Sequence, residues 1–369
     1  MSEEPNKAVI PVYKPFLDGR EINYVCKCLE SNCISSRGQF IKLFEESFAK
    51  YLNAKYATTV TNGTVALHLA LHTLGIKTGD EVIVPTLTYI ATVNAIAYVG
   101  ATPVFVDSRP DTWNVNVTQI ESKITDKTKA ILIVHLYGNP CAMDRVVGIC
   151  KKYNLFLVED VAEAFGSKYH EKYVGNFGDV STFSFFGNKT ITTGEGGMIV
   201  SKELAMHEKL TYIKSQAVSP DREYWHDEIG FNYRMTNICA AIGLAQLENA
   251  DIILQKKQQL AEWYKHELDR CPVVFQYNEP DTVNTYWMVS ILVKNKVIRD
   301  SLRAFLKQQG IETRPFFTPA HVMPVFASSH KFLVAESLGE CGLNLPSYPA
   351  LTKEDIMKIC SVIKEYFKT

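Results

Sequence analysis

Short apolar runs recur along the first part of the chain, and a span with helical spacing separates each run from the next. The runs fall at residues 56–60, 81–85, 104–107, 130–138 and 155–160, and two more flank residue 189. Strands that alternate with helices in this way are typical of a sheet covered by helices on both faces. The sequence therefore predicts an α/β domain.

The 369 residues exceed the size of one ordinary compact core, so we expect a large domain and a smaller one. Hydrophobic residues make up 46% of the chain and charged residues 21%, as in soluble globular proteins. The net charge of -1 gives no basic field for nucleic acid. We find no signal-peptide pattern and no apolar run long enough to span a bilayer, and we therefore expect a cytosolic protein without a membrane partner.

Nine cysteines are scattered along the chain. Their odd number and the absence of a secretory signal favour reduced thiols. Cys26, Cys28 and Cys33 lie close together, but their spacing fits no zinc signature and no histidine is near. We therefore expect no metal site.

Lys189 lies in a glycine-rich loop between the apolar runs 183–186 and 197–200. A lysine in a loop is ordinarily a solvated surface charge. Phenylalanines at 183, 185 and 186 precede this one, however, and small residues follow it, so we expect partial desolvation. Desolvation lowers the pKa of a lysine and frees the amine as a nucleophile. A lysine that forms a Schiff base with pyridoxal phosphate needs such surroundings.

Asp160 ends the apolar run 155–160. An acid at the C-terminal end of a buried strand lies where open α/β sheets bind ligands. It is also placed to cap a helix, because the helix-like residues 162–164 follow it. Pyridoxal phosphate enzymes pair the cofactor's pyridine nitrogen with a carboxylate, so the presence of Lys189 favours the catalytic interpretation.

A third feature is the run 56–60, which leads through Thr61, Asn62, Gly63 and Thr64 into an apolar helix. The first turn of a helix has unpaired N–H groups and the positive end of the helix dipole, and so suits a phosphate. An ordinary helix cap would give the same pattern. Both interpretations remain open from these residues alone.

Four segments resemble the motifs of the nucleotide-sugar aminotransferases of the DegT/DnrJ/EryC1/StrS family. They are residues 61–67 (TNGTVAL), 158–164 (VEDVAEA), 184–189 (SFFGNK) and 232–237 (NYRMTN). The resemblance runs from residues 10–13 (IPVY) to 343–347 (LNLPS). It implies the aspartate aminotransferase-like fold (fold type I), with a large mixed-sheet α/β domain at residues 1–250 and a smaller C-terminal α+β domain at residues 251–369.

The resemblance also implies a pyridoxal 5'-phosphate cofactor and roles for several residues. Lys189 would hold the cofactor and then transfer protons, and Asp160 would pair with the pyridine nitrogen. The remaining cofactor contacts would be Gly63, Thr64 and Ser184 at the phosphate, Tyr89 stacked on the ring, Glu163 near the phenolic oxygen, and Asn232 at the phosphate of a neighbouring subunit. A homodimer with shared active sites is therefore expected.

The implied substrates are L-glutamate and a nucleotide-linked 4-keto-6-deoxy sugar, which is converted to the 4-amino-4,6-dideoxy sugar. Arg234 is either a surface charge or the partner of the donor's carboxylate. Phe317 and His321 lie in a segment that resembles the family's nucleotide-sugar loop, although a lone histidine is more often structural.

Residues 224–227 (YWHD), 314–317 (RPFF) and Glu163 are most similar to the subgroup that converts GDP-4-keto-6-deoxymannose to GDP-perosamine. The chain departs from that subgroup at Thr318, where its members carry tyrosine. UDP- or dTDP-4-keto-6-deoxyglucose, which would give a viosamine-type product, is the alternative substrate.

Two other functions fit the sequence less well. The family's sugar dehydrases have histidine in place of the lysine, so Lys189 argues against that branch. A non-catalytic pyridoxal phosphate regulator would carry a DNA-binding module and a basic surface, and the near-neutral sequence indicates neither.

Overall fold

The structure is a computed structural model that describes residues 9–368. Its helices are α1 (Arg20–Glu30), α2 (Gln39–Leu52), α3 (Gly63–Thr73), α4 (Ile90–Tyr98), α5 (Met143–Tyr153), α6 (Leu204–Ile213), α7 (Asn237–Glu248), α8 (Ala250–Glu267), α9 (Lys296–Gln308), α10 (Leu333–Cys341) and α11 (Lys353–Tyr366). None of the helices in this range combines the length and apolar character needed to cross a membrane. All nine cysteines are free thiols.

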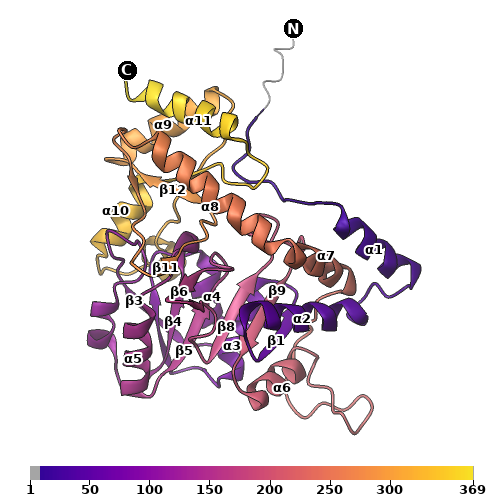
Figure 1. Cartoon of the computed structure of the whole chain (residues 1–369). Helices are drawn as coiled ribbons and strands as arrows, with labels where there is room; N and C mark the ends of the chain where they lie inside the picture. Colours follow the sequence, from indigo (N-terminus) through magenta and orange to yellow (C-terminus); the bar gives the residue numbers. More distant parts are fainter. Residues whose placement is uncertain (1–8, 369) are drawn as a thin grey trace, which may run out of the picture.

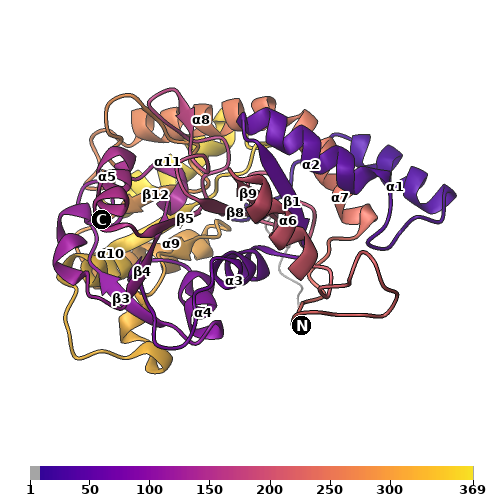
Figure 2. The ribbon, with the colours of Figure 1, turned by 90° about the horizontal axis from the view of Figure 1, so that it is seen from below.

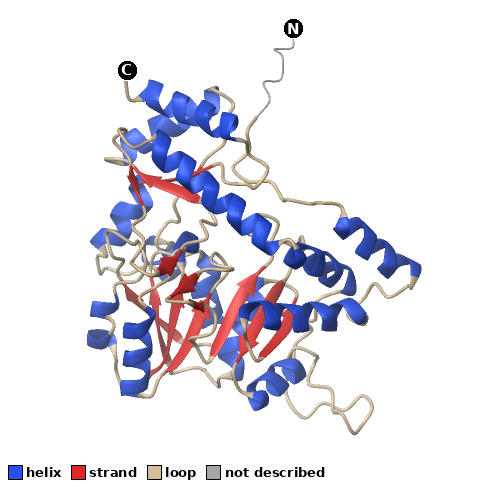
Figure 3. Ribbon diagram, in the orientation of Figure 1, coloured by secondary structure: helices blue, strands red, loops and turns tan. Residues whose placement is uncertain are grey.

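The predicted apolar runs form one seven-stranded sheet in the order β1-β9-β8-β5-β4-β2-β3 (Figures 1 and 3). The strands are β1 (Tyr56–Val60), β2 (Glu81–Pro85), β3 (Thr102–Val106), β4 (Thr128–Val134), β5 (Phe156–Asp160), β8 (Val180–Ser184) and β9 (Gly197–Ser201). Strand β9 is antiparallel to both of its neighbours, and the other pairs of β2, β3, β4, β5 and β8 are parallel. The predicted α/β fold with a mixed sheet is confirmed.

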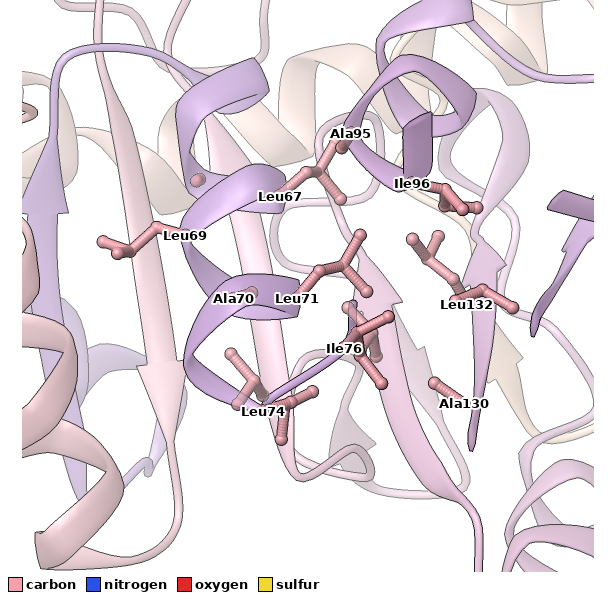
Figure 4. Close-up of a cluster of buried hydrophobic side chains, with 14 of the residues drawn as sticks. Leu67, Leu69, Ala70, Leu71, Leu74, Ile76, Ala95, Ile96, Ala130 and Leu132 are labelled. Atoms are coloured by element: carbon pink, nitrogen blue, oxygen red, sulfur yellow. The ribbon is translucent and has the colours of Figure 1, made fainter. Parts of the chain in front are cut away.

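Both faces of this sheet are buried, because side chains along a strand alternate between its two sides. Leu132 of β4 packs with α3 and α4, whereas its neighbours Ile131 and Ile133 pack with α5 on the other face. Figure 2 shows α3 and α4 on one side of the sheet and α2 and α5 on the other. Figure 4 draws part of the first layer, where Leu71 of α3, Ile96 of α4 and Leu132 belong to one buried cluster.

A second, antiparallel sheet lies in the C-terminal part of the chain, in the order β10-β12-β14-β13. Its strands are β10 (Val274–Phe275), β12 (Val289–Leu292), β13 (Arg314–Pro315) and β14 (Gly342–Leu345). They share a separate apolar core with α8, α9 and α11. A small third sheet joins β6 (Lys168–Tyr169), β7 (Lys172–Tyr173) and β11 (Thr282–Val283).

Helix α8 begins at Ala250 and runs from the large sheet toward the C-terminal helices (Figure 1). The domain boundary between residues 250 and 251 stays a prediction. The first eight residues of the predicted N-terminal domain lie outside the described residues.

The helix-like residues after Asp160 form turns, so the alternative that this aspartate caps a helix does not hold. The chain reverses there, with the N–H of Ala164 bonded to the carbonyl of Val161 and Gly166 at a φ of 82°. In the C-terminal part, Tyr286 has a φ of 48°, and β12 begins only at Val289.

Candidate active site

The loop that carries Lys189 joins β8 to β9 and is anchored by phenylalanines on either side of the strand end. Phe183 and Phe185 are buried, with ring centroids 5.0 and 5.6 Å from that of Phe48 on α2. Phe186, by contrast, is 43% exposed. The backbone then turns so that the N–H of Lys189 donates to the carbonyl of Phe186 at 2.9 Å. The packed phenylalanines at the end of β8 thus hold the loop that carries Lys189.

Lys189 lines a cavity of about 560 Å³ above the ends of the parallel strands. Residues that are far apart in the sequence meet on its wall. Those that the sequence analysis singled out are Gly63, Thr64, Tyr89, Asp160, Glu163, Ser184, Lys189 and Phe317. The tertiary structure therefore collects eight of the eleven predicted site residues around one space.

The Lys189 amine is held in surroundings that favour its neutral form. Loss of solvation lowers its pKa, and the nearby carboxylates of Glu163 and Asp160 oppose that shift only in part. Its Nζ lies 4.0 Å from the ring centroid of Trp287. The indole N–H of Trp287 in turn donates to the carbonyl of Asn188 at 2.7 Å.

Asp160 is buried at the end of β5, and burial raises the pKa of its carboxyl. Two hydrogen bonds oppose that shift by stabilising the charged form. Thr92 Oγ1 donates to Oδ2 at 2.8 Å, and the N–H of Ala162 donates to Oδ1 at 3.1 Å. The turn that replaces the predicted helix supplies this second donor.

Glu163 is also buried and faces the same cavity. Burial raises the pKa of its carboxyl to about 7, although the nearby Lys189 amine acts in the opposite direction. Its Oε2 accepts a hydrogen bond of 2.8 Å from the N–H of Tyr137. At neutral pH this carboxyl can therefore donate or accept a proton.

The start of α3 faces the cavity beside Ser184. Asn62 caps the helix, because its Oδ1 accepts from the N–H of Val65 at 3.0 Å. A Cβ atom on Gly63 would lie 2.7 Å from Cβ of Ser184, closer than real side chains approach. The first turn of this helix can thus be reached only because residue 63 is glycine.

The sequence matches the model of the DegT/DnrJ/EryC1/StrS aminotransferase family over residues 15–364. The chain belongs to this family. Among its relatives, the GDP-perosamine synthase of Escherichia coli O157:H7 is 56% identical over 97% of this chain and 98% of its own length. The GDP-perosamine synthase of Vibrio cholerae is 48% identical over 97% of this chain and 99% of its own length.

Several solved structures have a similar fold. Helicobacter pylori PseC, an aminotransferase involved in the biosynthesis of pseudoaminic acid, superposes with a TM-score of 0.93 at 27% identity, over 98% of this chain and 99% of its own. DesV of S. venezuelae gives 0.93 at 30% identity, over 98% and 100%. The predicted family, fold and pyridoxal phosphate dependence are confirmed.

The cavity fits the cofactor of this family. Pyridoxal phosphate requires an amine to bind its aldehyde, a carboxylate for its ring nitrogen and an anion site for its phosphate. Lys189, Asp160 and the start of α3 at Gly63 provide these groups on one wall. Tyr89, at the N-terminal end of α4, lines the same space and is 55% exposed, so its ring is available for stacking.

Three predicted site residues lie elsewhere. Asn232 and Arg234 do not line the cavity of their own chain, and Arg234 Nη2 donates to Asn232 Oδ1 at 3.0 Å. His321 is buried, with Nδ1 2.7 Å from Thr86 Oγ1 and Nε2 3.2 Å from Glu336 Oε1. Both of its ring nitrogens thus have partners within the chain, and its substrate-binding role stays a prediction.

Sequence reasoning missed Thr92, Tyr137 and Trp287. Thr92 lies three residues after Tyr89 on α4, which is a spacing that places both on one helix face. The other two residues gave no such signal. Trp287 lines the cavity and Tyr137 contacts Glu163 through its N–H, and positive φ values at residues 137 and 286 place both of them.

Proposed function

We propose that this aminotransferase moves the amino group of L-glutamate to C4 of a nucleotide-linked 4-keto-6-deoxy sugar, with GDP-4-keto-6-deoxymannose as substrate and GDP-perosamine as product. The observation that carries the proposal is a reactive lysine and a buried carboxylate on one cavity, in a chain 56% identical to a GDP-perosamine synthase. Glutamate loses its amino group and becomes 2-oxoglutarate, whose new carbonyl oxygen comes from water. The sugar ketone gains that amino group, and its oxygen leaves as water, so that no water is consumed overall.

Pyridoxal phosphate, when bound, supplies the aldehyde and electron-withdrawing ring on which an amino group is carried between the two substrates. Lys189 would bind the cofactor and then act as general base and acid, because burial lowers the pKa of its amine and so eases the release of a proton. Asp160 would pair with the ring nitrogen, and two hydrogen bonds fix the direction of this carboxylate.

Glu163 and the aromatic side chains of Tyr89 and Phe317 orient the bound molecules. Tyr89 and Phe317 lie with ring centroids 5.7 Å apart, and both line the cavity. Aromatic faces exclude water from the reacting centre, which strengthens the electrostatic interactions there. We propose that Phe317 and the loop that carries His321 contact the nucleotide sugar.

We further propose a homodimer in which Asn232 completes the phosphate site of the neighbouring subunit and Arg234 receives the carboxylate of glutamate. Neither residue lines the cavity of its own chain, which supports a role across an interface. The hydrogen bond between the two side chains would hold the amide and the guanidinium together at that surface.

The test is a panel assay of the purified protein with pyridoxal phosphate and L-glutamate. It compares GDP-4-keto-6-deoxymannose with UDP- and dTDP-4-keto-6-deoxyglucose, and mass spectrometry identifies the products. Preference for the GDP sugar supports the proposal. Preference for a UDP or dTDP sugar would reject the named product and would point to the loop at Thr318 as the source of the different specificity. Turnover by the Lys189→Ala variant would reject the mechanism.

A further inference from the structure

Trp287 reaches the active site from the C-terminal part of the chain. It lies two residues before the start of β12, yet its ring lies over the Lys189 amine, with Nζ 4.0 Å from the ring centroid. The ring is 5% exposed, so this contact is shielded from water. A cation over the face of an indole is stabilised by the ring's electron density, and most strongly where water is excluded.

Trp287 is held in place by contacts on several sides. Its indole N–H donates to the carbonyl of Asn188 at 2.7 Å, next to the lysine itself. Its own carbonyl accepts a hydrogen bond of 3.1 Å from the buried Lys257 of α8. The ring also stacks with Tyr137 and Phe317, at centroid distances of 6.2 and 6.3 Å and interplanar angles of 21°. Contacts with several parts of the fold therefore fix the position of the Trp287 side chain.

We propose that Trp287 is a positioning residue for the reactive lysine: its ring face holds the free Lys189 amine in place and stabilises its protonated form. The amine is free whenever the amino group resides on the cofactor or on a substrate, and it must then return to the same atoms in each cycle. The fixed ring of Trp287 would keep the Lys189 amine close to the cofactor while no covalent bond joins them. This inference rests on the assignment of Lys189 as the cofactor lysine.

The contact acts together with the charges around Lys189. Those that line its cavity or the smaller one behind the loop are Asp160, Glu163, Glu195, Lys14 and Lys257. The first two carboxylates favour the ammonium form, whereas desolvation disfavours it. Replacement of the ring face by an aliphatic side chain should therefore lower the pKa of the free amine.

The experiment uses the full-length protein loaded with pyridoxamine phosphate, which leaves the Lys189 amine free. Trace acetylation is measured at Lys189 by mass spectrometry from pH 6 to 11, for wild type, Trp287→Leu and Trp287→Phe. We expect Trp287→Leu to lower the pKa of Lys189 by about 0.5 to 1.5 pH units. Trp287→Phe keeps an aromatic face and should shift it by less than half as much.

Met288→Leu is the matched control, because Met288 is the buried neighbour of Trp287 and has no aromatic ring to place against the Lys189 amine. It should leave the acetylation profile unchanged. An unchanged or raised pKa in a folded Trp287→Leu protein would overturn the proposal. If Trp287→Leu fails to fold, equal shifts in Trp287→Phe and Met288→Leu would overturn it. The acetylation profile requires no turnover. It can therefore contradict this proposal while the sugar assay still supports the proposed function.

Discussion

Thr92 Oγ1 donates a hydrogen bond of 2.8 Å to Oδ2 of Asp160, so that a residue on α4 holds the carboxylate at the end of β5. Thr92 is itself 3.0 Å from Thr88 through the two hydroxyl oxygens. All three side chains are buried. Burial alone would favour a neutral Asp160, and a neutral carboxyl could not stabilise a protonated ring nitrogen.

Thr92→Val removes this donor and keeps the shape of the side chain. A hydrogen bond to a charged group contributes about 1.5–3 kcal/mol, so we expect kcat to fall by about 10- to 100-fold. The pKa of Asp160 should rise further, and steady-state kinetics across pH would reveal this. Thr73→Val is the control, because its hydroxyl is buried without a hydrogen-bond partner in residues 9–368. Equal kinetics for both variants would contradict the role of Thr92.

Gly63→Ala should weaken cofactor binding. The added Cβ would lie 2.7 Å from Cβ of Ser184, so the start of α3 must move away from the cavity. We expect the Kd for pyridoxal phosphate to rise by at least about tenfold, which corresponds to about 1.4 kcal/mol. Absorbance titration of the cofactor measures it. Gly148→Ala in α5, where the added Cβ meets nothing within 4 Å, should bind as wild type does.

Glu163 should make stability depend on pH. Its folded-state pKa of about 7 lies above the ordinary value of 4.5, so the folded chain binds more protons than the unfolded chain between these values. The stabilisation is complete below pH 4.5 and is lost as the pH rises through 7, by up to about 3 kcal/mol. In Glu163→Gln this loss is absent.

Thermal melts of the cofactor-free protein at pH 5 and pH 8 provide the measurement. The melting temperature of Glu163→Gln relative to wild type should be higher at pH 8 than at pH 5. Glu171→Gln, which changes an exposed glutamate in the turn between β6 and β7, should follow wild type. Parallel melting curves for wild type and Glu163→Gln would show that this carboxyl titrates normally.

Asn232→Ala should reduce cofactor affinity if the site is shared between subunits. A mixture of Lys189→Ala and Asn232→Ala chains gives the sharper result. In a mixed dimer, one site would combine a wild-type lysine with a wild-type asparagine from the other chain. Random pairing should then restore about a quarter of wild-type activity. No recovery after mixing and reassociation would place Asn232 in its own chain's site or outside any site.

Much of the large domain could be predicted from local pattern. A strand that is buried on both faces of its sheet appears in the sequence as a near-continuous apolar stretch. All seven strands of the main sheet lie at or beside predicted runs of this kind. The loop of Lys189 was predictable because glycines and phenylalanines frame it within a few residues. The family motifs then supplied the roles of Asp160, Gly63 and Ser184, and these residues do line one cavity.

Other features depend on contacts between distant segments, which local pattern does not encode. The residues after Asp160 have helical composition but form turns, in which Glu163 accepts a hydrogen bond from the distant Tyr137 and the N–H of Ala162 donates to Asp160. His321 is buried by Thr86 and Glu336, which lie 235 and 15 residues away.

The sequence by itself determined the alternation of strands and helices, the reactive lysine and the family, since each depends on residues that are near neighbours or on ordered motifs. Only the tertiary structure decided which side chains surround that lysine. Trp287 lies 98 positions from Lys189 in the numbering and belongs to a buried cluster that brings it together with Leu136 and Tyr137. Such a contact depends on the free energy gained when large apolar surfaces are buried together, and short-range sequence patterns do not predict it.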